Sequence, residues 1–173
     1  MRTIRIFVVD TSYLLELYRV DGCCHGDAYS FVANKFRDNI DTGRFFVPVP
    51  VLFELANHIA DIHDVQRRRC LAEKLRDNIQ SSLSEQTPWV ITHATDARSL
   101  DDLLSALSES AMRFSGEFST QKLGLTDTTI ILEAERLRKK FVSDSLRNYQ
   151  IHIWTRHREL KAREPDTEDS QFV

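Results

Sequence analysis

Glycine, proline and cysteine are all scarce in this chain, and each shortage excludes a class of protein. Five glycines and four prolines among 173 residues exclude collagen-like and low-complexity sequences. The three cysteines include the adjacent pair Cys23 and Cys24, and an odd number with this spacing does not form a disulfide framework. Hydrophobic residues make up 42% of the chain, so it can build a core without disulfides or a structural metal.

Long hydrophobic runs are also missing. The longest, Phe45–Phe53, contains two prolines and is far shorter than the roughly 20 residues that a membrane helix needs. The first residues lead directly into a strand-like segment and to Asp10, which is not the pattern of a signal peptide. Together with the free thiols, these features lead us to expect a soluble, cytoplasmic protein.

Charge is unevenly distributed along the chain. The net charge is −3, yet residues 121–163 hold ten Lys and Arg against five Asp and Glu, and residues 164–173 hold four acidic residues and no basic one. A nucleic-acid surface and an ordinary solvated helix surface both explain the basic stretch. We expect one domain over residues 1–163 and an acidic, disordered tail over 164–173, which could fold over the basic surface.

Four short apolar segments are predicted as buried strands, and segments with helical periodicity separate them. The predicted strands are Ile4–Val9, Phe45–Val49, Trp89–Ile91 and Ile151–Trp154. Strands and helices that alternate in this way indicate an α/β fold with three layers, α/β/α, around a mainly parallel central sheet. In such sheets ligands bind beyond the carboxyl ends of the strands.

Two of the predicted helices carry clear apolar stripes. The helix that Asp27 opens has a stripe that includes Phe36 and Ile40, and a helix capped by Thr95 and Asp96 carries a row of leucines. Trp89 and Trp154 lie in predicted strands, so we expect both in the core.

Three carboxylates stand where predicted strands give way to helices. Asp10 directly follows the first strand, Glu54 lies in the first turn after the second, and Asp127 lies in the first turn of a helix that Thr126 caps. Helix capping and the helix dipole explain each acid taken alone. Three carboxylates at one sheet edge repel each other, and a divalent cation is the usual compensation. Oxygen ligands of this kind favour Mg²⁺ or Mn²⁺, which can activate water against a phosphodiester.

Four segments resemble, in the same order, the sequence motifs of PIN-domain ribonucleases. They are IFVVDTSYLL at 6–15, VPVPVLFEL at 47–55, GLTDTTIILEA at 124–134 and IHIWTRHREL at 151–160. The resemblance extends over residues 4–160. It implies a metal-dependent endoribonuclease that uses Mg²⁺ or Mn²⁺.

The resemblance also implies roles for individual residues. Asp10, Glu54 and Asp127 would be the catalytic metal ligands. At the family's fourth acidic position this chain has His157, which we count as catalytic although an imidazole brings no negative charge. The side chains expected to support the site are Thr11, Ser12 and Thr155.

Three consequences of the histidine stay open at this point. The site could bind one ion through its three acids and be active, Glu159 could replace the missing carboxylate, or the domain could be a degraded module that binds RNA. His58, one helical turn after Glu54, either faces the site or lies on the helix surface.

The same resemblance implies partners beyond the RNA substrate. Many PIN proteins of this size are toxins that pair with an antitoxin protein, and many are homodimers. The candidates for contact with RNA phosphates, for each of which a solvated side chain is the simpler explanation, are Arg136, Arg138, Lys139, Lys140, Arg156 and Arg158. A nucleotide-binding domain is set aside, because no glycine-rich loop follows the first strand.

Overall fold

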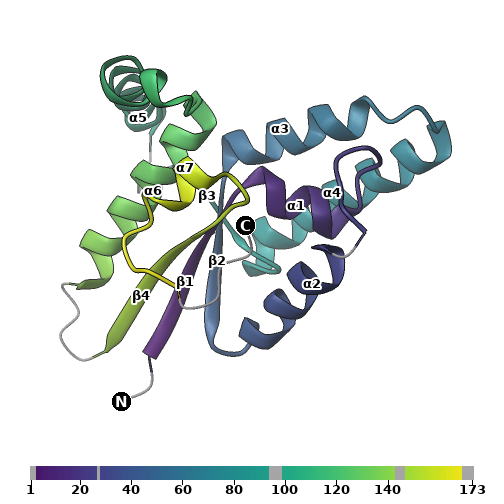
Figure 1. Ribbon diagram of the computed structural model, residues 1–173, viewed down its shortest axis with the longest axis horizontal. Helices are drawn as coiled ribbons and strands as arrows, with labels where there is room; N and C mark the ends of the chain where they lie inside the picture. Colours follow the sequence, from purple (N-terminus) through teal and green to yellow (C-terminus); the bar gives the residue numbers. More distant parts are fainter. Residues whose placement is uncertain (1–2, 27, 94–98, 143–146, 169–173) are drawn as a thin grey trace.

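The computed structural model describes residues 3–26, 28–93, 99–142 and 147–168. A four-stranded, fully parallel sheet in the order β3-β2-β1-β4 forms the middle of the molecule, and helices cover it (Figure 1). The three-layer α/β/α fold expected from the sequence is therefore confirmed.

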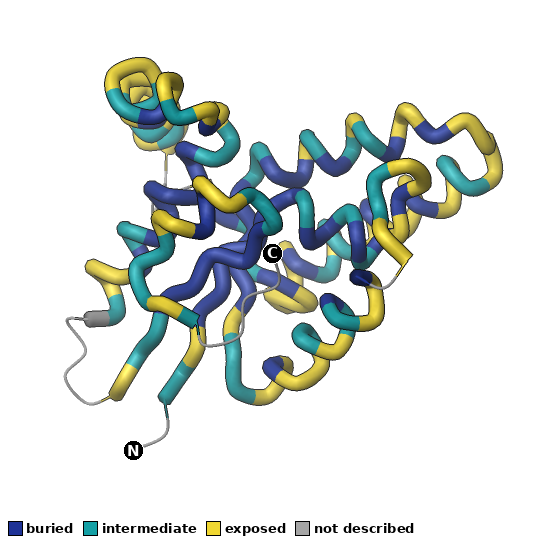
Figure 2. Tube along the Cα trace, in the orientation of Figure 1, coloured by how far each residue is buried: buried dark blue, intermediate teal, exposed yellow. Residues whose placement is uncertain are grey.

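All four predicted strands are present. They are β1 (Thr3–Val9), β2 (Gly43–Pro48), β3 (Val90–Thr92) and β4 (Asn148–Trp154). Residues Ile6–Val9 of β1 are completely buried, because β1 lies between two neighbouring strands and beneath helices on both faces. Figure 2 shows this buried centre as the dark blue middle of the sheet.

The helices connect the strands in a regular way. They are α1 (Thr11–Tyr18), α2 (Ala28–Asn39), α3 (Val49–Ala60), α4 (Val65–Glu85), α5 (Leu100–Arg113), α6 (Leu125–Val142) and α7 (Arg158–Lys161), with short helical turns η1 (Phe114–Phe118) and η2 (Ser119–Gln121). Helices α2 and α3 both pack against α1, α4 packs against α3, and α6 packs against β1, β2 and β4 (Figure 1).

Aromatic rings fill the core beside β1. The ring centroids of Phe7 and Trp154 are 4.0 Å apart, and those of Phe36 and Phe45 are 4.6 Å apart. Trp89 and Trp154 are both buried, as the sequence predicts. Such contacts between offset or tilted rings add to the hydrophobic stabilisation of this layer.

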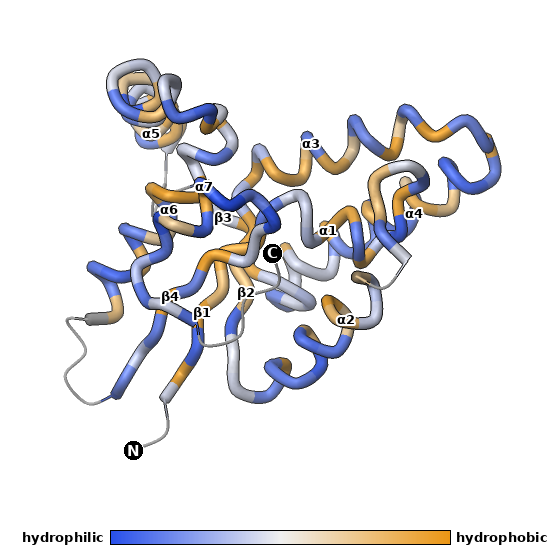
Figure 3. The backbone as a smooth tube through the Cα atoms, viewed as in Figure 1, coloured by the Kyte–Doolittle hydropathy of each residue, from blue (hydrophilic) through white to orange (hydrophobic). Residues whose placement is uncertain are grey.

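Two helices differ from their sequence-based expectations. Ile40, predicted on the apolar stripe of α2, lies just beyond the helix and is 67% exposed. The leucine row of α5 is largely exposed at Leu100, Leu104 and Leu107, because this helix stands away from the sheet (Figures 2 and 3). The predicted caps at Asp27 and at Thr95 and Asp96 lie outside the described residues; α5 is capped by Ser99.

The C-terminal segment also differs from its expectation, which was a separate, disordered tail from Glu164. Residues 164–168 instead pack along the outer edge of β4, while 169–173 lie outside the described residues. The guanidinium group of Arg138 contacts the carbonyl oxygen of Pro165 in this segment and lies 3.6 Å from Asp166.

The reason for this packing is the open edge of β4. The Ile151 N–H donates to Asp166 Oδ2 at 2.8 Å, and the Ile153 N–H donates to Glu164 Oε2 at 3.2 Å. Lys161 Nζ donates to Glu164 Oε2 at 2.6 Å and balances its charge. Edge N–H groups need acceptors, and here two acidic side chains of the segment provide them.

Among the described residues, we find no helix with both the length and the apolar character needed to cross a membrane.

Gly43, at the start of β2, provides a test of the packing. A Cβ atom there would lie 2.8 Å from Phe7 Cε2 and 2.9 Å from the carbonyl oxygen of Asn39. We expect Gly43→Ala to lower the free energy of unfolding by about 2 kcal/mol, because buried ring and backbone atoms must move. Urea denaturation measures the change.

Gly116→Ala is the matched control, since nothing lies within 4 Å of its Cβ position in a helical turn. We expect it to leave stability unchanged or to raise it by up to about 1 kcal/mol. Equal stability of Gly43→Ala and the wild type would show that the tight approach to Phe7 is not a constraint.

Candidate metal centre at the carboxyl edge of the sheet

A cavity of about 380 Å³ lies where β1 and β4 end and where α1 and α6 begin. The four side chains predicted to be catalytic, Asp10, Glu54, Asp127 and His157, all line it, although they come from four separate segments. The full set of lining residues adds Thr11, Ser12, Leu15, His58, Gly124, Leu125 and Thr126. The structure therefore brings the predicted site residues together.

Asp10 is the most firmly held of the carboxylates. Its side chain is buried; Oδ1 accepts from the Thr11 N–H at 2.7 Å, and Oδ2 accepts from Ser12 Oγ at 2.7 Å and from Thr155 Oγ1 at 2.8 Å. These contacts also cap α1, so the capping explanation and the site explanation hold together. The three side chains expected to support the site, Thr11, Ser12 and Thr155, each contact a carboxylate.

Glu54 reaches the cavity from the first half of α3. Its Oε2 accepts from Thr11 Oγ1 at 2.8 Å, while the Thr11 N–H donates to Asp10. Thr11 therefore links the two carboxylates through separate donors. His58, one turn later on α3, also lines the cavity, and its Nδ1 lies 3.7 Å from Cys23 Sγ.

Asp127 faces the same cavity from the first turn of α6. Its Oδ2 accepts from the Gly124 N–H at 2.7 Å, an arrangement that favours the ionised carboxylate. The pKa of Asp127 is nevertheless raised above 3.8, mainly because burial removes water from the carboxylate and also because the charge of Asp10 repels it. His157 opposes this shift. Burial first, and the charge of Asp10 second, therefore disfavour ionisation of Asp127.

His157 lies between two carboxylates. Its Nδ1 is 3.8 Å from Asp127 Oδ2 and its Nε2 is 3.3 Å from Glu159 Oε2, while its backbone N–H donates to Thr155 Oγ1 at 2.9 Å. Glu159 does not line the cavity, and it contacts the outer nitrogen of the imidazole. The structure thus gives no support to Glu159 as a replacement ligand.

At least three of the six cations predicted to contact RNA lie against acidic side chains of the protein; one is Arg138, 3.6 Å from Asp166. Arg156 Nη1 donates to the completely buried Glu16, and Arg136 Nη2 donates to the completely buried Glu133 at 2.7 Å. Arg138, Lys139, Lys140 and Arg158 are exposed. The basic surface is therefore smaller than the sequence indicates.

Glu16 is the residue near the site that sequence reasoning missed. Its carboxylate accepts from Arg156 and from the backbone N–H of His25 at 3.1 Å. The backbone N–H of Arg156 donates to Ser12 Oγ at 2.9 Å, so this buried ion pair positions the loop after β4 against Asp10 and its partners. A charged residue among apolar neighbours in α1 was the signal available in the sequence.

The donor chemistry of the cavity fits a hard divalent cation. The carboxylates of Asp10, Glu54 and Asp127 offer oxygen ligands of the type that Mg²⁺ and Mn²⁺ prefer, and a cation would relieve the repulsion that raises the pKa of Asp127. Over the described residues, no three His, Cys, Asp or Glu side chains are already arranged as a metal-binding group.

No protein-family model matches this chain, and a search of curated proteins finds no relative. The resemblance to PIN-domain ribonucleases rests on the four sequence motifs.

The raised pKa of Asp127 can be measured without metal. We expect its carboxyl group to titrate above 3.8 in ¹³C NMR of the metal-free protein, and Asp10→Asn to lower this pKa because one repelling charge is removed. The exposed Asp61→Asn is the control and should leave it unchanged. An Asp127 pKa that does not respond to Asp10→Asn would mean that the two carboxylates are not electrostatically coupled.

Proposed function

We propose that the protein is a metal-dependent endoribonuclease that hydrolyses phosphodiester bonds of RNA with Mg²⁺ or Mn²⁺. The observation that carries this proposal is the convergence of Asp10, Glu54 and Asp127 in one cavity at the carboxyl edge of a parallel sheet. These are the same three acids that the PIN-like motifs select in the sequence, and that agreement supports the proposal.

Asp10, Asp127 and Glu54 would hold the ion. When bound, a divalent cation supplies the positive charge that lowers the pKa of water and neutralises a scissile phosphate. The protein's own hydrogen bonds prepare the ligands: Thr155 and Ser12 orient Oδ2 of Asp10, and Thr11 orients Glu54. Because these donors are supplied by the fold, little reorganisation of Asp10 is needed when RNA binds.

Because His157 takes the place of a carboxylate, this site carries less negative charge than one with four carboxylates. Its imidazole stands beside Asp127 in the cavity, where it can donate a hydrogen bond to a phosphate oxygen or hold a water molecule. Three carboxylates suit a single divalent ion better than a pair of divalent ions. We therefore propose a one-ion site in which His157 contacts the substrate.

Exposed cations would hold the rest of the RNA. Arg138, Lys139 and Lys140 at the end of α6 and Arg158 after β4 are exposed and positively charged, as phosphate contacts require. We extend the proposal to a cytoplasmic toxin that acts as a homodimer and is controlled by an antitoxin protein. That extension is supported by the resemblance to PIN proteins alone.

Cleavage of a labelled, structured RNA tests the proposed activity. We expect cleavage with Mg²⁺ or Mn²⁺, none with EDTA, and a loss of about a hundredfold or more in Asp10→Asn, which exceeds the usual effect of losing a mere supporting group. Asp61→Asn is the matched control, and circular dichroism confirms that both variants fold. Cleavage that EDTA and Asp10→Asn leave unchanged would refute the proposed metal centre.

A second function, RNA binding without cleavage, is favoured by the imidazole at the fourth position. His157→Asp distinguishes the two functions, because it adds a carboxylate beside Asp127. For an active nuclease we expect tighter Mn²⁺ binding, about tenfold, measured by calorimetry, and cleavage by both proteins. A wild type that retains RNA in a gel shift without cutting it, together with cleavage by His157→Asp, would identify a degraded nuclease that binds RNA.

A further inference from the structure

The turn that follows α1 places a thiol beside an imidazole. Cys23 is half-buried in this turn, and its Sγ lies 3.7 Å from Nδ1 of His58 on α3, a hydrogen-bond contact between segments 35 residues apart. The backbone N–H groups of Cys23 and Cys24 both donate to the Val20 carbonyl oxygen, at 3.0 and 3.1 Å. The side chain of Cys23 also packs against the hydrophobic core. Because backbone and side chain are both held, the thiol and the imidazole form a defined pair.

This pair has the composition of an activated nucleophile. With Nδ1 unprotonated, the imidazole of His58 accepts the S–H proton of Cys23 and leaves a thiolate. The thiolate is the form of cysteine that attacks electrophiles, whereas most of a free thiol population is protonated at neutral pH. An imidazole at contact distance therefore increases the reactive fraction of the thiol.

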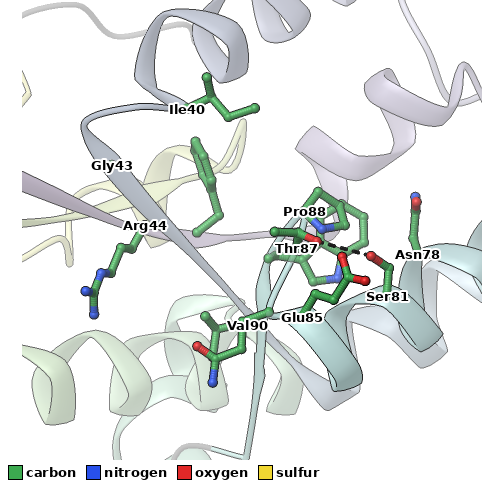
Figure 4. A pocket seen from close by; sticks show the side chains of 12 residues that line it. Ile40, Gly43, Arg44, Asn78, Ser81, Glu85, Thr87, Pro88 and Val90 are labelled. Carbon is green, nitrogen blue, oxygen red and sulfur yellow. Dashed lines mark hydrogen bonds between the residues drawn. The ribbon is translucent and has the colours of Figure 1, made fainter.

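The chain contains two other thiols that serve as internal comparisons. In the described part of the chain, neither has an imidazole at hydrogen-bond distance. Cys24 is half-buried, and Cys70 is exposed on α4. Cys70 lines neither the cavity that contains Asp10 nor a second cavity of about 610 Å³ where β2 and β3 begin, to which α4 contributes Ser81 (Figure 4). Exposure alone ranks Cys70 as the most reactive thiol, and the imidazole contact ranks Cys23 first.

Solvent reaches the pair from the carboxyl edge of the sheet. His58 lines the cavity of about 380 Å³ at that edge, and Cys23 is only partly covered. A small polar oxidant such as hydrogen peroxide, which is little larger than water, can enter where water enters. A bulky electrophile meets more obstruction at a half-buried thiol.

We propose that Cys23 is a site of oxidation by a hydroperoxide, with His58 as the base. His58 takes the S–H proton, and the thiolate sulfur attacks one peroxide oxygen, so that an S–O bond forms as the O–O bond breaks. The hydroxide that leaves takes the proton from His58 and becomes water. Sγ is oxidised to a sulfenic acid, and the peroxide is reduced. This reaction uses neither RNA nor a metal ion, so it is independent of the proposed nuclease activity.

Alkylation by iodoacetamide tests whether His58 activates the thiol. In the folded protein at neutral pH, we expect Cys23 to react about tenfold faster than Cys70, with peptide mass spectrometry resolving the cysteines. His58→Gln should remove this advantage and leave the rate of Cys70 unchanged, and circular dichroism checks that the variant folds. In guanidinium chloride the two thiols of the wild type should react at similar rates, because unfolding separates Cys23 from His58.

Hydrogen peroxide with dimedone, which traps sulfenic acids, tests the oxidation itself. Cys24→Ser is the background, so that a neighbouring thiol cannot consume the sulfenic acid by forming a disulfide. We expect the label on Cys23, little on Cys70, and about tenfold less on Cys23 when His58→Gln is added. Equal labelling of Cys23 and Cys70 would overturn the proposal, and so would a Cys23 alkylation rate that His58→Gln does not change. If His58→Gln does not fold, the ratio of Cys23 to Cys70 in the wild type, folded against unfolded, decides.

Discussion

The carboxylate of Asp10 joins three parts of the chain, and the geometry of the candidate site depends on it. β1 and β4 are parallel neighbours with Val9 opposite Trp154, and the Asp10 N–H donates to the Trp154 carbonyl at 2.9 Å. This register places Thr155 where its hydroxyl reaches Asp10. The same carboxylate caps α1. The Asp10 backbone therefore continues the strand pairing, while its side chain joins the start of α1 to the end of β4.

Burial of several carboxylates at one edge has an electrostatic cost that the fold only partly offsets. Helix N-termini and hydroxyl groups provide donors to Asp10, Glu54 and Asp127, and Arg156 balances the buried Glu16. The raised pKa of Asp127 shows that repulsion and desolvation persist. A divalent cation at this edge would offset that cost.

The two edges of the sheet differ in character for a topological reason. At the carboxyl edge the strands lead into helix N-termini, so polar donors and acids gather there. At the amino edge the chain arrives from helices α2 and α4; there Gly43 lies close to Phe7, and Trp89 is buried. The free side of β4 is covered by Glu164 and Asp166, which prevents pairing with another strand.

The sequence by itself determined the strands, the fold class and the acids at the strand ends, because apolar periodicity and helix starts are local properties of the chain. Tertiary structure decided the partners of the charged groups. Arg156 meets Glu16 and Asp166 meets Ile151 only after folding, so neither the ion pair nor the packing of residues 164–168 on β4 could be foreseen. The exposure of the leucines of α5 was also decided by tertiary structure. Periodicity shows which face of a helix is apolar, and only packing decides whether anything covers it.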